Sequence, residues 1–221
     1  MTNSRSYTLI TALFAVVLVV SNVAASKVTS FWGLTLDAGT VLFPLSYIFG
    51  DVLTEVYGYA ASRRVIWIGF ASTFLAAATF MIVGALPPAP EWGNQAAYES
   101  ILGLTPRIVC ASLVAFLIGE FANSYVLARM KVAMAGKYLW MRTVGSTLVG
   151  ELLDTSVFTI VAFWGVFPDN IILPMIISMY LFKVAIEAVF TPVTYAVVRY
   201  LKKHEGVDVY DRDTNFNPFR V

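Results

Sequence analysis

Charged residues are scarce in this chain of 221 residues. Asp, Glu, Lys and Arg make up 13% of it, against roughly 25% in a soluble domain, whereas hydrophobic residues make up 58%. So few charges cannot cover a water-facing surface, which excludes an ordinary soluble domain. The formal net charge of +1 lacks the basic excess that is typical of nucleic-acid-binding proteins, and we expect no nucleic-acid partner.

Cysteine and histidine each occur once, as Cys110 and His204. A single cysteine cannot form a disulfide within the chain, and the apolar run around Cys110 predicts a small core residue. The phosphate-binding pattern GxxxxGK followed by Ser or Thr is absent, and so is the zinc-binding pattern HExxH. These absences argue against an enzyme and against ATP hydrolysis by this chain. We expect no catalytic residue, no cofactor and no bound metal.

Long apolar runs dominate the rest of the sequence. A transmembrane helix needs about 20 apolar residues, and no segment alternates long enough to indicate a strand. The runs are Tyr7–Ala25, Ala38–Tyr57, Val65–Leu86, Pro106–Ala128, Thr143–Val166 and Ile171–Tyr200. The first could be mistaken for a signal peptide, but its length favours a retained helix. The sequence predicts an all-α integral membrane protein with six transmembrane helices in one domain over residues 1–203, followed by a polar tail at 204–221.

Lysine and arginine are distributed unevenly between the predicted connections. Only Lys27 and Arg107 fall on one side of a six-helix arrangement. The residues on the other side are Arg5, Arg63, Arg64, Arg129, Lys131, Lys137, Arg142, Arg199, Lys202 and Lys203. Cytoplasmic loops carry the excess of Lys and Arg. Both termini are therefore predicted to be cytoplasmic, with the tail lying loosely on that face.

Ionisable side chains nevertheless lie inside the apolar runs. An ionised group at membrane depth costs at least about 2.5–3.5 kcal/mol, and such groups usually face the protein interior. Lys183 is the base among them, and the acids are Asp51, Glu55, Glu120, Glu151, Asp154 and Glu187. That they only hold helices together is one interpretation. The surplus of acids favours a polar binding site, because unpaired carboxylates need protons, water, or a cationic or hydrogen-bonding ligand.

Three of the runs share a short pattern: an apolar residue, a glycine, an acid, and a second polar group three or four positions after the acid. The acids are Asp51, Glu120 and Glu151, and the second groups are Glu55, Asn123 and Asp154. At helical spacing the acid and the second group share one face. The glycine lets a neighbouring helix approach closely, or lets its own helix kink and free a backbone carbonyl. In the last run Lys183 and Glu187 are four apart and could pair.

Aromatic and proline residues bear on the shape of such a site. Phe43 and Tyr47 lie one to two helical turns before Asp51, where they could stack on a flat ring. Pro44 and Pro192 tend to kink their helices, and broken helices often border a substrate cavity. Ordinary bending is the alternative for either proline.

Three phrases of the sequence resemble a known family. They are FPLSYIFGDVLTEVYG at residues 43–58 followed by Arg63-Arg64, GSTLVGELLDT at residues 145–155, and FKVAIE at residues 182–187. In this order they are similar to the bacterial queuosine precursor transporters of the vitamin uptake transporter family. The resemblance implies a six-helix protein of the bacterial inner (cytoplasmic) membrane that imports 7-deazaguanine bases. Which base is imported (preQ0, preQ1 or queuine), and whether protons drive its uptake, stays open.

Carboxylates suit a guanine-like edge, because they accept paired hydrogen bonds from its N–H donors. The residues expected to bind the base are Glu151, Asp154, Asp51, Glu120, Asn123, Phe43 and Tyr47. The residues expected to orient this network or to carry a coupling ion are Glu55, Lys183 and Glu187.

Other functions and assemblies stay open. An energy-coupling-factor importer has a substrate-binding membrane subunit of similar size, but the first run lacks the AxxxA stripe with which such subunits dock on their partner. In an intramembrane enzyme acting on a lipid, the acid clusters could hold a divalent metal, but metal sites more often carry His or a denser set of carboxylates. Runs of small residues, such as residues 60–62 and 76–78, suit packing within one chain or between two copies of a homodimer.

Overall fold

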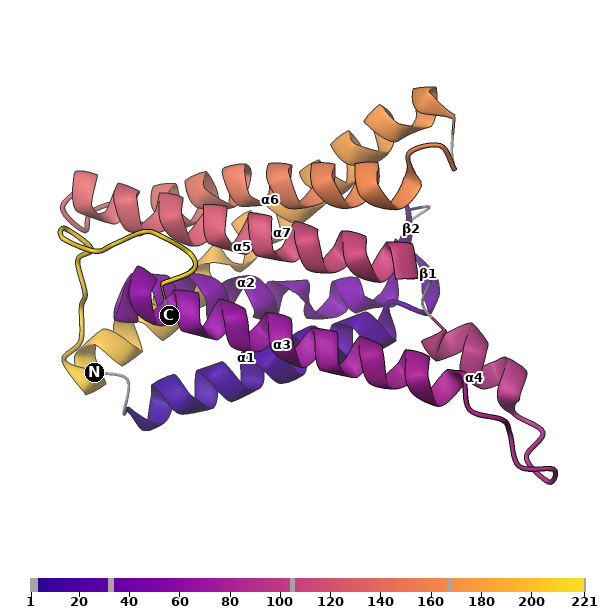
Figure 1. The fold of residues 1–221 in the computed structure, drawn as a ribbon. Coiled ribbons are helices and arrows are strands. Elements are labelled where there is room, and N and C mark those ends of the chain that lie inside the picture. Colours follow the sequence, from indigo (N-terminus) through magenta and orange to yellow (C-terminus); the bar gives the residue numbers. More distant parts are fainter. Residues whose placement is uncertain (1–3, 32–33, 104–105, 167, 221) are drawn as a thin grey trace.

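The protein is a bundle of long helices in a computed structural model, which describes residues 4–31, 34–103, 106–166 and 168–220 (Figure 1). Five helical segments of the described chain are long and apolar enough to cross a membrane. They are α1 (Arg5–Ala24), α3 (Tyr59–Gly84), α5 (Pro106–Ala133, preceded by the short α4, Gln95–Leu102), α6 (Leu139–Phe163) and α7 (Asp169–Glu205). These segments match five of the six predicted runs and confirm a mainly helical architecture.

The second predicted run, residues 38–57, is not one continuous α-helix. It consists of the 3-10 helix η1 (Ala38–Leu42), α2 (Phe43–Val52) and the π-helix η2 (Leu53–Tyr57). Pro44 lies in the first turn of α2, where its missing N–H costs no hydrogen bond, so it begins the helix instead of kinking it. Because this segment is broken, the number of six crossings stays a prediction.

A short hairpin precedes η1. Strand β1 (Val28–Phe31) pairs with β2 (Leu34–Asp37) in an antiparallel register that sets Val28 opposite Asp37. The all-α prediction missed this hairpin, because strands of four residues are too short for an alternating pattern to stand out.

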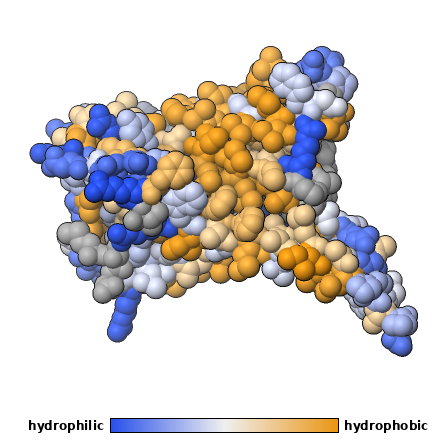
Figure 2. All heavy atoms as spheres, viewed as in Figure 1, coloured by the Kyte–Doolittle hydropathy of each residue, from blue (hydrophilic) through white to orange (hydrophobic). Residues whose placement is uncertain are grey.

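The ends of the bundle are more hydrophilic than its middle (Figure 2). Both chain ends lie at one end of the bundle, and the hairpin and α4 lie at the other (Figure 1). Figure 2 shows an apolar band across the middle of the visible face, with hydrophilic residues gathered at either end. This distribution is typical of a protein that crosses a bilayer. Both termini share one side, as predicted, while the assignment of that side to the cytoplasm stays a prediction.

Helices α5 and α6 pack closely at two glycines. A Cβ added at Gly119 would lie 2.7 Å from Cβ of Asp154, and one added at Gly150 would lie 2.7 Å from Cβ of Asn123. A larger side chain at either glycine would force the two helices apart. The expected role of the glycines in close packing is confirmed for this pair, and it brings Asn123 and Asp154 to the same level of the bundle.

The apolar core lies between α1, α2, η2 and α3. Phe14, Val52, Val56 and Val65 have at most 1% of their surface exposed there. Cys110, which was predicted to be a core residue, is instead exposed on α5. An apolar run does not separate core from lipid-facing positions, because lipid tails are as apolar as a protein core.

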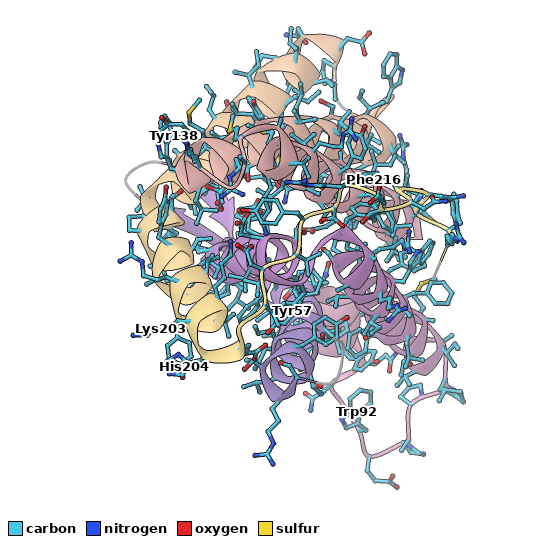
Figure 3. The ribbon with its side chains drawn as sticks, turned by 90° about the vertical axis from the view of Figure 1, so that its left-hand side faces the viewer. Tyr57, Trp92, Tyr138, Lys203, His204 and Phe216 are labelled. Carbon is cyan, nitrogen blue, oxygen red and sulfur yellow. The ribbon has the colours of Figure 1, made fainter. Side chains whose placement is uncertain are left out.

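The tail after α7 folds back across the end of the bundle, as Figure 3 shows from that end. Val209 N donates to the Val56 carbonyl at 3.1 Å, and the Asp211 carboxylate accepts from Tyr59 N at 3.0 Å. Asp211 is only 2% exposed, and Arg63 donates to two tail carbonyls at 2.9 and 2.8 Å. The prediction of a loosely lying tail is therefore wrong. The predicted boundary at residue 203 falls within α7, and residue 221 lies outside the described residues.

Candidate functional site

Four helices contribute acids to one cluster inside the bundle, here called the carboxylate cluster. Its acids are Asp51 on α2, Glu120 on α5, Glu151 and Asp154 on α6, and Glu187 on α7. Glycine makes room for it on α2, since a Cβ added at Gly50 would lie 3.3 Å from Oε2 of Glu120. The acids that follow the glycine in all three glycine–acid patterns therefore converge on one site.

Lys183 of α7 holds the two acids of α6. Its Nζ donates to Oδ2 of Asp154 at 2.6 Å and forms an ion pair with Oε2 of Glu151 at 2.9 Å. Lys183 is 8% exposed and Glu151 9%, whereas the Asp154 side chain is 24% exposed. Among the ion pairs of the described residues, Lys183 pairs with α6 and not with Glu187, although the sequence allowed that pair. We call Lys183, Glu151 and Asp154 the Lys183 triad. Asp154 is its most exposed member and therefore the one that an incoming ligand reaches most easily.

The other side of the carboxylate cluster lacks a cation. Asp51 and Glu187 are each 1% exposed, and their carboxyl groups lie close enough to share a hydrogen bond. Asn123 Nδ2 donates to Oδ1 of Asp51 at 3.1 Å. Within the described part of the chain, no other donor reaches Oδ2 of Asp51 or either carboxyl oxygen of Glu187. These oxygens form the part of the site that is most in need of protons or donors.

Two aromatic rings of α2 border the Lys183 triad. The ring centroids of Phe43 and Tyr47 are 6.2 Å apart, and Lys183 Nζ lies 5.4 Å from the centroid of Phe43. The Tyr47 hydroxyl lies beside the Glu151 carboxylate. The structure therefore brings together the residues that the sequence predicted to bind a ligand, and their roles in binding stay predictions.

Glu55 lies in a different network, although it follows Asp51 by only four residues. It is fully buried and pairs with Arg142 Nη1, with Lys202 Nζ at 2.7 Å and with Lys131 Nζ at 3.8 Å. We call Glu55, Lys131, Arg142, Lys202 and Asp208 the Glu55 network. Since η2 is a π-helix, the four-residue spacing no longer keeps Glu55 on the face of Asp51.

The tail completes the Glu55 network through Asp208. Its Oδ1 accepts from Lys131 at 2.5 Å and lies 2.8 Å from Lys202 Nζ. Partial burial raises the pKa of the Asp208 carboxyl, but the hydrogen bonds from the two lysines outweigh it and hold that pKa below its usual value. From the sequence, Lys131, Arg142 and Lys202 were predicted only to lie on the cytoplasmic side, because nothing in their local sequence distinguishes a buried cation from an exposed one.

Buried threonines near the site were not predicted either. Thr155 and Thr159 on α6 and Thr194 on α7 are fully buried, and their hydroxyls have no hydrogen-bond partner among the described residues. Glu151, Thr155 and Thr159 follow one another at four-residue steps and so share one face of α6. That spacing was the available signal, and it marks a polar stripe leading away from the carboxylate cluster.

The sequence of this chain is similar to known proteins over most of its length. Residues 37–197, which include every member of the carboxylate cluster, match the family described as putative vitamin uptake transporters. The chain belongs to this family. It is 35% identical over 190 residues, covering 85% of this chain and 82% of the relative, to a probable queuosine precursor transporter of Bacillus subtilis (strain 168). It is 26% identical over 182 residues, covering 80% and 79%, to the queuosine precursor transporter of Escherichia coli (strain K12).

Membership of the vitamin uptake transporter family confirms the resemblance seen in the sequence. The chain is a transporter and not an enzyme, and its apolar helices make it a multi-pass membrane protein. No solved structure matches the chain.

Proposed function

We propose that this transporter imports queuosine precursors, 7-deazaguanine bases, across the bacterial inner membrane and binds them at the Lys183 triad of the carboxylate cluster. In this proposal residues 38–57 form a sixth crossing and both termini are cytoplasmic. The printed functions of the relatives support the substrate class. The observation that carries the site is the grouping of five acids in the described interior of the bundle with one lysine, Lys183, which pairs with only two of them.

The Lys183 triad suits the polar edge of such a base. Glu151 and Asp154 converge on one ammonium group, so they present acceptor oxygens toward a common point. A guanine-like edge carries adjacent N–H donors, which can share or replace the contacts of Lys183. Phe43 and Tyr47 lie next to this point and offer rings on which a flat heterocycle can stack.

Binding to the purified protein tests this proposal. We expect 7-deazaguanine bases to bind in preference to guanine, and we expect Glu151→Gln and Asp154→Asn to abolish that binding, because an amide offers one acceptor fewer and carries no charge. Glu91→Gln, in the exposed connection before α4, is the matched control and should bind like the wild type. Wild-type binding in both triad variants would remove the site assignment, and failure of the wild type to bind any base would remove the substrate class.

Uptake is, in the same proposal, coupled to protons. The carboxylate cluster holds more acids than Lys183 can neutralise, and protons are the simplest counter-charge that a membrane interior can supply. Uptake into cells should fall when a protonophore collapses the proton gradient. Uptake that continues at an undiminished rate would rule the coupling out.

A further inference from the structure

Asp51 and Glu187 form a pair of carboxyl groups buried against each other. They come from α2 and α7, each is 1% exposed, and their carboxyl groups lie next to each other. The carboxyl oxygens of Glu187 have no hydrogen-bond partner in the described residues, and Asp51 has only the amide of Asn123. Apart from that amide, the pair is therefore an unpartnered polar group on the side of the carboxylate cluster that lacks a cation.

This geometry requires a proton. A carboxylate has acceptor oxygens but no donor, so two ionised carboxylates cannot hydrogen-bond to each other, whereas a carboxylic acid can donate to a carboxylate. Like charges this close in a buried site cannot both ionise at acceptable cost, which is why neighbouring acids in other proteins share one proton.

The charged groups around the pair make a second negative charge still less favourable. Glu120 faces it from α5 and Glu151 from α6. Lys183 lies one turn before Glu187 on α7, but its ion pairs are made with Glu151 and Asp154. The pair therefore has no cation of its own within the described residues, and a proton is the charge that it can gain or lose.

We propose that Asp51 and Glu187 hold one shared proton and form the proton-binding site of this transporter, separate from the Lys183 triad that binds the base. This inference rests on the proposed function for its role in transport, but not for the presence of the proton. It moves Asp51 from the base-binding set, where the sequence had placed it, to the coupling site.

Infrared spectroscopy of the purified protein tests for the proton without any substrate. A protonated carboxyl group absorbs at a C=O stretch that a carboxylate lacks. The spectrum of the wild type minus that of the double variant Asp51→Asn/Glu187→Gln should contain this band at neutral pH, whereas the wild type minus Glu91→Gln should not. A difference spectrum that contains only carboxylate bands would overturn the inference, even if the protein proves to transport a queuosine precursor.

Transport by reconstituted protein tests the role of the pair. Glu187→Gln should retain the exchange of labelled for unlabelled base at equal pH on both sides, because the Lys183 triad is intact. It should lose the accumulation of base that an imposed pH gradient drives in the wild type. Gradient-driven accumulation at the wild-type level in both Glu187→Gln and Asp51→Asn would refute the coupling role. Failure of the wild type to exchange any base would instead refute the proposed substrate and leave the infrared result standing.

Discussion

Asp51 and Glu55 are buried acids only four residues apart, yet their electrostatic surroundings are opposite. Glu55 is surrounded by Arg142, Lys202 and Lys131. Asp51 has an amide on one oxygen and another carboxyl group beside it. A buried charge that is fully paired has little left to bind, whereas a buried carboxyl without a cation can still take a proton or a donor. The Glu55 network therefore has the properties of a cluster that stabilises the fold, and the carboxylate cluster has those of a site that binds a proton or a ligand.

The two regions also differ in how they connect the chain. The Glu55 network joins η2, α5, α6, α7 and the tail at the end of the bundle that carries both chain ends. Ser4 and Tyr57 add further hydrogen bonds there, because both donate to the Glu205 carboxylate, at 2.7 and 2.8 Å. The carboxylate cluster instead joins four helices mainly through one lysine and one amide. The described helices are therefore held together by fewer ion pairs at the cluster than at the network.

The largest effect is expected from breaking the Glu55 network. Arg142→Met removes the buried guanidinium and leaves Glu55 with less counter-charge, which costs about 3–5 kcal/mol when a buried pair loses one partner. The unfolding midpoint of the purified protein in detergent should fall well below that of the wild type. The matched control is Arg199→Met, at an exposed position of α7, and it should leave the midpoint nearly unchanged. Equal midpoints for the two variants would contradict a structural role for the network.

A smaller loss of stability is expected at the helix crossing that builds the carboxylate cluster. The Cβ of Gly150→Ala would lie 2.7 Å from Cβ of Asn123, so α6 must shift from α5 at a cost of about 1–3 kcal/mol. Base binding should weaken as well, since Asp154 moves with α6. The control Gly145→Ala meets only the end of the Met130 side chain, its methyl group at 3.0 Å and its Sδ at 3.3 Å, and a flexible methionine can adapt. Equal unfolding midpoints and equal affinities in the two alanine variants would show that the crossing is not tight.

Asp208→Asn should produce a still smaller, pH-dependent effect on the Glu55 network. The pKa of Asp208 is lowered in the folded protein by hydrogen bonds from Lys131 and Lys202. Its contribution to the free energy of unfolding is therefore complete above the unfolded-state pKa, about 3.9, and is lost as the pH falls through the lower folded-state pKa. Because the side chain is 41% exposed, the contribution at neutral pH should be about 1 kcal/mol or less. The unfolding midpoints of the wild type and of Asp208→Asn, measured from neutral to acid pH, should converge only where the pH falls below the folded-state pKa of Asp208.

Glu187→Gln should have the smallest effect on stability, and it sharpens the contrast with Arg142→Met. It removes a carboxyl group that has no cation and supplies an amide that can donate to Asp51. The unfolding midpoint should stay at the wild-type value or rise slightly. A fall in the unfolding midpoint as large as that of Arg142→Met would show that the carboxylate cluster stabilises the fold as much as the Glu55 network does.

The membership of the site was more predictable than its pairing. The glycine–acid pattern correctly grouped Glu120 with Asn123 and Glu151 with Asp154, because α5 and α6 are regular helices in which such spacings share a face. The same rule failed for Asp51 and Glu55, because η2 is a π-helix, and the residue types of this segment do not signal that change. Lys183 and Glu187 share a helix at the right spacing, yet Lys183 is drawn to two acids on α6.

The sequence by itself determined that this is a mainly helical membrane protein, which of its residues carry charge into the apolar interior, and which transporter family it belongs to. Hydropathy, loop charge and short motifs are properties of the chain read in order, so they need no knowledge of contacts. Only the tertiary structure decided which acids are neutralised and which are left without a cation. That outcome depends on side chains from several helices and a folded-back tail meeting in space.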